Sequence, residues 1–261
     1  MVIRRIREHV AAHNWFAVAV DLAIVVLGVF LGTQVSNWNQ ERGERAQSHE
    51  DRQRLLADLG SNTADFANRL RYFQAVRGHA QATLDALDRP TAADEQFLIH
   101  AYQATQIILA DPKRVTYDEV LATGRLTRLG DPRLRDKIGN FYVAMASAGP
   151  FLNNVPPFRE QLRRALPSAV QAAIRKRCPE RYDFLPDGTL LNSLPDRCAL
   201  GLDPATVAKG VSAVRAMPDA PVELNRLIDD LDVKIELIGP TLGQIRELRT
   251  QLATADAEAN R

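Results

Sequence analysis

The strongest constraint on this chain is an apolar run near its N-terminus, residues 15–35 (WFAVAVDLAIVVLGVFLGTQV). Within it, only Asp21, Gly28, Gly32, Thr33 and Gln34 are not apolar. As a helix rising 1.5 Å per residue, the run is about 31 Å long, which matches the roughly 30 Å hydrocarbon core of a bilayer. A core helix of a soluble protein is rarely apolar on every face. The sequence therefore predicts a transmembrane helix.

The flanks of this run indicate an uncleaved signal anchor. A signal peptide has an apolar core of about 7–15 residues followed by a small-residue cleavage site, whereas this run is longer and continues into SNWNQER. Three arginines precede the span and four follow it, so their number alone leaves the orientation open. Because the N-terminal arginines are tightly grouped and long domains translocate regardless of charge, we expect residues 1–14 in the bacterial cytoplasm and 36–261 in the periplasm. Trp15 and Trp38 would then be interfacial anchors of a single-pass inner-membrane protein.

One stripe of the predicted span carries its unusual residues. Helical steps of 100° place Asp21, Val25, Gly28 and Gly32 within about 60° of one another. The two glycines form a GxxxG pattern, which lets membrane helices approach closely and favours a homo-oligomer or another membrane protein as partner. In the simpler interpretation, Asp21 reaches toward the headgroups and the glycines have no special role. The sequence leaves both interpretations open.

The two cysteines, Cys178 and Cys198, flank a segment rich in Pro, Asp and Gly. We expect an irregular loop over about 178–202, closed by a disulfide that stabilises the fold by roughly 3 kcal/mol. A disulfide favours an oxidising compartment such as the periplasm. The alternative is a pair of free thiols. The spacing fits neither a CxxC redox motif nor a zinc site.

Downstream of the span, apolar residues recur at the three- and four-residue steps of helices. One series runs from Leu56 to Leu87, continuing the membrane helix as far as Pro90, and another runs from Leu224 to Leu252. Capping and breaker residues predict shorter helices within 91–112, 115–124, 131–150, 151–177 and 203–217. Thr91 and Thr116 lie three residues before Asp94 and Glu119, as N-capping residues would. No alternating pattern is long enough to predict a strand.

These patterns predict an all-α fold, with the transmembrane helix continuing into an extracytoplasmic bundle built on two long antiparallel helices, 50–88 and 221–256. The expected core residues come from both long helices: Leu59, Phe66, Leu70, Phe73, Leu231, Ile235, Ile238 and Ile245.

At this point the chain resembles a bacterial family of single-span membrane proteins known only as a domain of unknown function. The likeness covers about residues 15–145 and lies in LAIVVLGVFLGTQVSNWNQER, LLADLGSN and TYDEVLATGRLTRLGDPRLRDKIGNFY. Members of that family have a span that begins with Glu-Leu, an Asn-Asn-Trp-Asn-Glu box, a Leu-rich helix and a Thr-Tyr-x-Glu-Leu-x-x-Thr-Gly segment. Here Asp21 replaces the Glu and Ser36 the first Asn. The resemblance implies a one-span helical protein and supplies no catalytic residues.

Net charge and the absence of catalytic motifs exclude several classes of function. A net charge of +1 argues against a nucleic-acid surface. No serine-hydrolase, metalloprotease or P-loop motif occurs, so we expect no enzymatic activity, cofactor or metal. The leading hypothesis is a non-catalytic membrane-anchored scaffold or accessory subunit that binds other envelope proteins. The alternatives are a periplasmic ligand-sensing module and, by a looser resemblance, a proton-linked accessory subunit of an envelope motor that uses Asp21.

Overall fold

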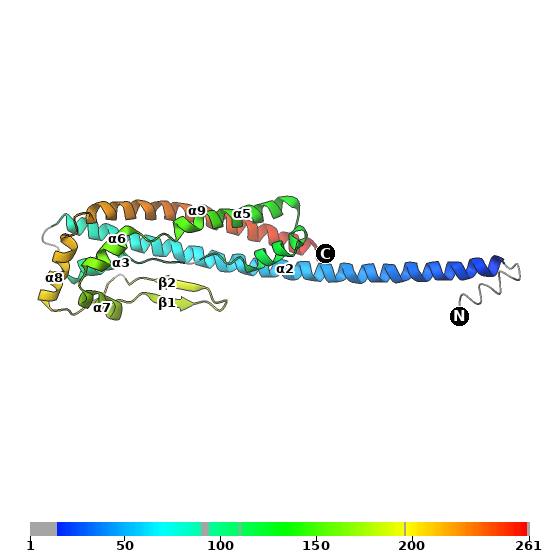
Figure 1. Ribbon diagram of the computed structural model, residues 1–261, viewed down its shortest axis with the longest axis horizontal. Coiled ribbons are helices and arrows are strands. Elements are labelled where there is room, and N and C mark those ends of the chain that lie inside the picture. The colour runs from blue at the N-terminus through cyan, green and yellow to red at the C-terminus, as the bar shows by residue number, and fades with distance from the viewer. Residues whose placement is uncertain (1–14, 90–93, 110, 196, 260–261) are drawn as a thin grey trace. The chain divides into compact units, whose positions relative to one another are not determined.

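The computed structural model describes residues 15–89, 94–109, 111–195 and 197–259 (Figure 1). The predicted cytoplasmic tail and Thr91 lie outside these residues. The chain divides into two compact units, Met1–Asp51 and Arg52–Arg261, and each is described by itself. As predicted, helices dominate the described residues. The elements in order are α2 (Trp15–Leu87), α3 (Glu95–Gln103), α4 (Val115–Ala122), the 3-10 helix η1 (Arg125–Arg128), α5 (Pro132–Leu152), α6 (Pro157–Ala165), α7 (Ser168–Arg177), β1 (Arg181–Phe184), β2 (Leu190–Ser193), α8 (Pro204–Arg215) and α9 (Ala220–Ala259).

Within the second unit, the C-terminal part of α2 and the helix α9 lie side by side in opposite directions (Figure 1). The Arg52 Nε donates to the Asp256 carboxylate at 2.7 Å, and the Arg77 guanidinium contacts Asp232. These pairs join the start of one helix segment to the end of the other, so the predicted antiparallel pair is confirmed.

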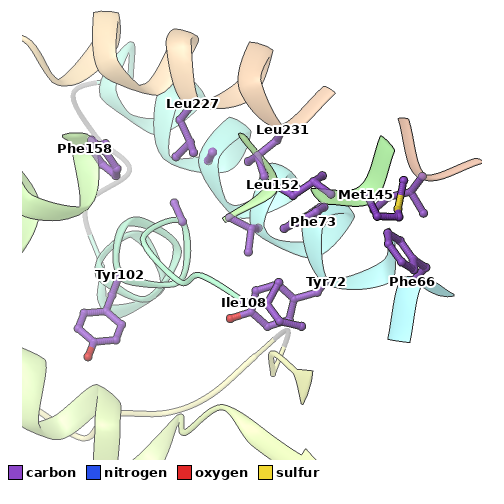
Figure 2. Packing of buried hydrophobic residues seen from close by; sticks show 14 of the residues in the cluster. Phe66, Tyr72, Phe73, Tyr102, Ile108, Met145, Leu152, Phe158, Leu227 and Leu231 are labelled. Atoms are coloured by element: carbon purple, nitrogen blue, oxygen red, sulfur yellow. The ribbon is translucent and has the colours of Figure 1, made fainter. Parts of the chain in front are cut away.

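The predicted core is confirmed as well. Six of its members are buried: Leu59, Phe66, Phe73, Leu231, Ile238 and Ile245. Leu70 and Ile235 are half-buried and pack against this core. Figure 2 shows Leu227 and Leu231 of α9 pointing toward α2, where Phe73 lies near Leu152 of α5. The three- and four-residue spacing of apolar residues therefore places the faces of both helices correctly.

The segment predicted as an irregular loop contains a β-hairpin, so that prediction is wrong. β1 and β2 pair antiparallel, with Arg181 opposite Ser193 and Phe184 opposite Leu190. The turn closes where the Leu185 N–H donates to the Thr189 carbonyl at 2.9 Å, and Gly188 takes a φ of 80° that favours glycine. The strands have four residues each, too short for alternation to identify them. The predicted disulfide between Cys178 and Cys198 is present and closes the base of the hairpin, with a Cα–Cα distance of 5.7 Å.

Three helix ends differ from prediction. The helix α3 stops at Gln103 rather than near Pro112, because the chain turns at Thr105, whose hydroxyl donates to the Tyr102 carbonyl at 2.7 Å. Its cap is Asp94, whose carboxylate accepts from the Phe97 N–H. The helix α5 continues through Pro150 to Leu152, whose buried side chain belongs to the core.

The predicted Thr116–Glu119 capping box on α4 is absent. Arg114 occupies the N-cap position without a side-chain hydrogen bond, and Thr116 lies inside the helix. The Glu119 carboxylate instead accepts from Arg54 at 2.6 Å and from Arg125 at 3.0 Å. These two cations hold the pKa of Glu119 below its usual value through their hydrogen bonds. The predicted end of this helix at Gly124 agrees with that residue's φ of 69°.

Candidate functional site

Among the described residues, α2 is the one helix long and apolar enough to cross a membrane, and its N-terminal part lies in the first unit. Its most apolar 18-residue window has a mean hydropathy of 2.2, and none of that window is buried within the structure. The side chains of Trp15 and Trp38 are 70% and 55% exposed, and the Arg42 guanidinium lies 4.4 Å from the Trp38 ring centroid. Their predicted role as interfacial anchors stays a prediction.

The predicted pairing stripe is an open surface. Val25 is exposed, Asp21 is half-buried, and a Cβ atom added at Gly28 or Gly32 would meet nothing within 4 Å. A flat face of this kind is what close helix–helix packing in lipid requires. Its use in pairing also stays a prediction.

In the second unit, polar side chains on α2 hold the chain segment that precedes α4. The buried Asn62 side chain donates to the Lys113 carbonyl at 2.9 Å and accepts from the Lys113 N–H at 2.7 Å. The Asp58 carboxylate accepts from the Thr116 N–H at 3.2 Å and so satisfies a free donor in the first turn of α4. The side chains of Asn62 and Asp58 therefore make hydrogen bonds with backbone groups of this segment that have no backbone partner.

A second asparagine on α2 holds the hairpin. With its amide oriented to match, the buried Asn68 donates to the Asn192 carbonyl and accepts from the Asn192 N–H, both at 3.0 Å. Strand β2 therefore lies against α2 through a pair of hydrogen bonds that resembles a sheet ladder.

The tip of the hairpin is pinned by a cluster of three side chains, Ser61, Lys113 and Asp187. The Lys113 ammonium donates to Ser61 Oγ at 3.0 Å and to Asp187 through its carbonyl at 3.0 Å and its carboxylate at 3.4 Å. Hydrogen bonds from Ser61, first, and then from Thr189 hold the pKa of Asp187 far below its usual value. A serine–lysine pair can serve as nucleophile and base, but a base needs a free lone pair. Here the Ser61 hydroxyl donates to the Asp187 carboxylate and accepts from Lys113, so its proton is not directed at the amine and the cluster fits a latch better than a catalytic dyad.

Between α2, the described residues of 107–109 and 111–113, and the hairpin lies a cavity of about 210 Å³, which we call the hairpin groove. Its polar lining residues include three carboxylates, Asp65, Asp111 and Glu180, beside the latch. Burial raises the pKa of Asp65 although the Arg69 guanidinium, 2.9 Å away, opposes this. Leu109 and Tyr182 line the groove and are each 57% exposed. Phe184, opposite groove-lining Leu190 on the hairpin, is 71% exposed. The groove thus combines polar lining residues with exposed aromatic and aliphatic side chains.

None of these groove residues could be identified from the sequence as a site. They come from three separate segments and have no shared spacing. The turn sequence Pro186-Asp187-Gly188 was the one local signal, since these residue types favour tight turns.

Comparison of the chain with protein-family models, with curated proteins and with solved structures finds no match.

Proposed function

We propose that this protein is a non-catalytic, membrane-anchored scaffold or accessory subunit of the bacterial envelope. Residues 15–35 would span the inner membrane, with residues 1–14 in the cytoplasm and the helical domain in the periplasm. The fully exposed apolar helix and the Cys178–Cys198 disulfide support this placement. The same helix would pair with a second copy or with another membrane protein through its Asp21–Gly32 stripe.

In this proposal the hairpin groove binds an extended segment of another envelope protein. The observation that carries it is the exposure of Leu109 and Tyr182, which line the cavity, and of Phe184, which pairs with groove-lining Leu190. Large aromatic side chains contribute most of the energy at protein interfaces when a partner covers them. A two-stranded hairpin held at its base by a disulfide and at its tip by Ser61 and Lys113 presents these groups in a fixed arrangement.

Site-specific photo-crosslinking tests this function. A photoreactive phenylalanine analogue at Phe184 should yield a crosslinked envelope protein in intact membranes, and the Phe184→Ser variant should lose co-purification of that same protein. Val143 on α5 is similarly exposed, at 64%, and serves as the matched control position. Identical adducts at both positions, or none at Phe184, would contradict the groove as the binding surface.

The alternative motor-subunit hypothesis makes a separate demand on Asp21. Replacement by Asn would abolish function while leaving assembly intact only if Asp21 carries protons. A scaffold that binds through the groove would keep its function.

A further inference from the structure

A second cavity, of about 490 Å³, adjoins the hairpin groove and shares Ile107, Glu180 and Tyr182 with it. Its other walls come from α3, α6 and α7, and three of its lining residues are the arginines Arg159, Arg163 and Arg175. We call this cavity the arginine pocket.

Two of the arginines are held by neutral partners. Arg159 and Arg163 are four residues apart on α6 and therefore share a helix face. The Arg163 Nε donates to the Thr105 hydroxyl at 3.0 Å, and its guanidinium carbon lies 3.5 Å from the ring centroid of buried Tyr102. The Arg159 guanidinium donates to the Thr105 carbonyl. These contacts orient both guanidinium groups, and because the partners are uncharged, each guanidinium keeps its full positive charge.

The pocket has a surplus of positive charge. Among the described residues, no carboxylate lies within ion-pair distance of Arg159, Arg163 or Arg175. The one acid on the wall, Glu180, already accepts from Asn192 at 2.7 Å and from the Tyr182 hydroxyl at 3.0 Å. Glu160, the acid on α6, lies outside the pocket lining and pairs with Arg164.

Arg175, the third arginine of the pocket, lies in the last turn of α7. Burial lowers the pKa of Arg163, Tyr102 opposes this, and the charges of Arg159 and Arg175 lower it by smaller amounts.

We propose that the arginine pocket binds a small oxyanion carrying two or more negative charges, of the phosphate or phosphomonoester class. A guanidinium presents a planar pair of donors that matches the oxygens of such a group. The cavity volume falls in the range of small-ligand sites, roughly 300–1,000 Å³. Ile107 and the Tyr182 ring offer apolar walls for the organic part of an ester. The pocket shares Tyr182 with the hairpin groove, but anion binding would depend on the arginines, which the proposed protein-binding role does not use, so either proposal can fail without the other.

Titration calorimetry of the full-length protein in a neutral detergent, with inorganic pyrophosphate as the probe at low ionic strength, tests the proposal. We expect saturable binding to the wild type that weakens about tenfold in Arg159→Gln and in Arg175→Gln, the effect of losing one charge-assisted hydrogen bond. Arg164→Gln is the matched control, because Arg164 lies on the same helix, is exposed and pairs with Glu160 outside the pocket. It should bind pyrophosphate like the wild type.

Far-UV circular dichroism checks that each variant is folded; Arg163 is left unchanged because its stacking on Tyr102 is part of the fold. Absence of saturable binding in the wild type overturns the proposal, as would be found if these arginines served only acidic side chains of a partner protein. Equal weakening in Arg164→Gln and Arg175→Gln overturns it too, since net charge alone would then explain the binding.

Discussion

Lys234 is a buried cation in the core between α2, α5 and α9, and its burial makes the stability of this protein depend on pH. The side chain is 6% exposed, and its ammonium lies 5.4 Å from the Phe73 ring centroid and 5.6 Å from that of Phe151. It donates to the Asn154 side-chain oxygen at 2.5 Å, and no carboxylate of the described residues forms an ion pair with it. Burial lowers the pKa of Lys234 from 10.5 to about 8, against a smaller opposing effect of Asp230.

The size of the effect follows from that shift. A change of one in a pKa corresponds to about 1.36 kcal/mol. The lowering of the Lys234 pKa from 10.5 to about 8 therefore means that folding disfavours the charged form, relative to the neutral form, by about 3 kcal/mol. Between these two pH values the folded state binds fewer protons than the unfolded state, so the free energy of unfolding rises with pH across this window. Below pH 8 the cost of the buried charge is fully present. Lys234→Met removes this cost but leaves the Asn154 oxygen without its donor, a loss of about 1–3 kcal/mol.

We therefore expect Lys234→Met to be equal to or more stable than the wild type at pH 7, and the difference to move against the variant by about 3 kcal/mol between pH 7 and pH 10.5. Guanidinium unfolding of the full chain in detergent, followed by far-UV circular dichroism across this range, measures both. Other titrating groups cancel in the difference between variant and wild type. Lys209→Met is the control, because Lys209 is exposed. If the two methionine variants show the same pH dependence, the reasoning about burial is refuted.

Three further predictions concern the disulfide, the Asp58 cap and the membrane helix. Cys198→Ser should lower the free energy of unfolding by about 3 kcal/mol, because it opens a loop of about 20 residues. Alkylation of both cysteines in unreduced protein from membranes would contradict both the disulfide and the periplasmic placement. Asp58→Ala should cost about 1 kcal/mol by freeing the Thr116 N–H, visible as a lower melting temperature, whereas an unchanged value would show that water replaces the cap. Gly28→Leu and Gly32→Leu should weaken self-association in a membrane two-hybrid assay and Ile24→Leu should not; equal signals would argue against the stripe.

The helical part of the fold was accessible from sequence because its signals are local and repeat many times. The series of apolar residues from Leu56 to Leu87 extends over several heptads, and every turn places its apolar residues on the same face of the helix. The end of α4 at Gly124 and the start of α5 at Asp131, whose carboxylate accepts from the Leu134 N–H at 2.8 Å, each depend on only a few neighbouring residues. A long periodic pattern therefore predicts both the helix and the face that it buries.

The hairpin and the arginine pocket were not accessible in this way because they depend on contacts between distant segments. Four-residue strands carry little periodic signal, and β2 is held by Asn68, more than a hundred positions away in the chain. The arginines of the pocket lie on α6 and α7 and meet only because Pro167 breaks the helix between them. With 33 basic residues in the chain, no local pattern separates these three from the rest.

The contacts of α2 bear on what the resemblance to the single-span family means. Two of the three segments that carry it, LLADLGSN and the one that begins TYDEVLATG, meet in the structure, because Asp58 accepts from Thr116 and Asn62 holds the backbone of Lys113 just before α4. These residues are used within the fold, as a cap and a clamp. A motif of this kind joins a short helix to a long one, so it concerns the architecture and does not identify a binding surface. The residues that decide what this protein binds should then be sought where the fold leaves groups uncovered or uncompensated, at Tyr182 and Phe184 on the hairpin and at Arg175 in the arginine pocket.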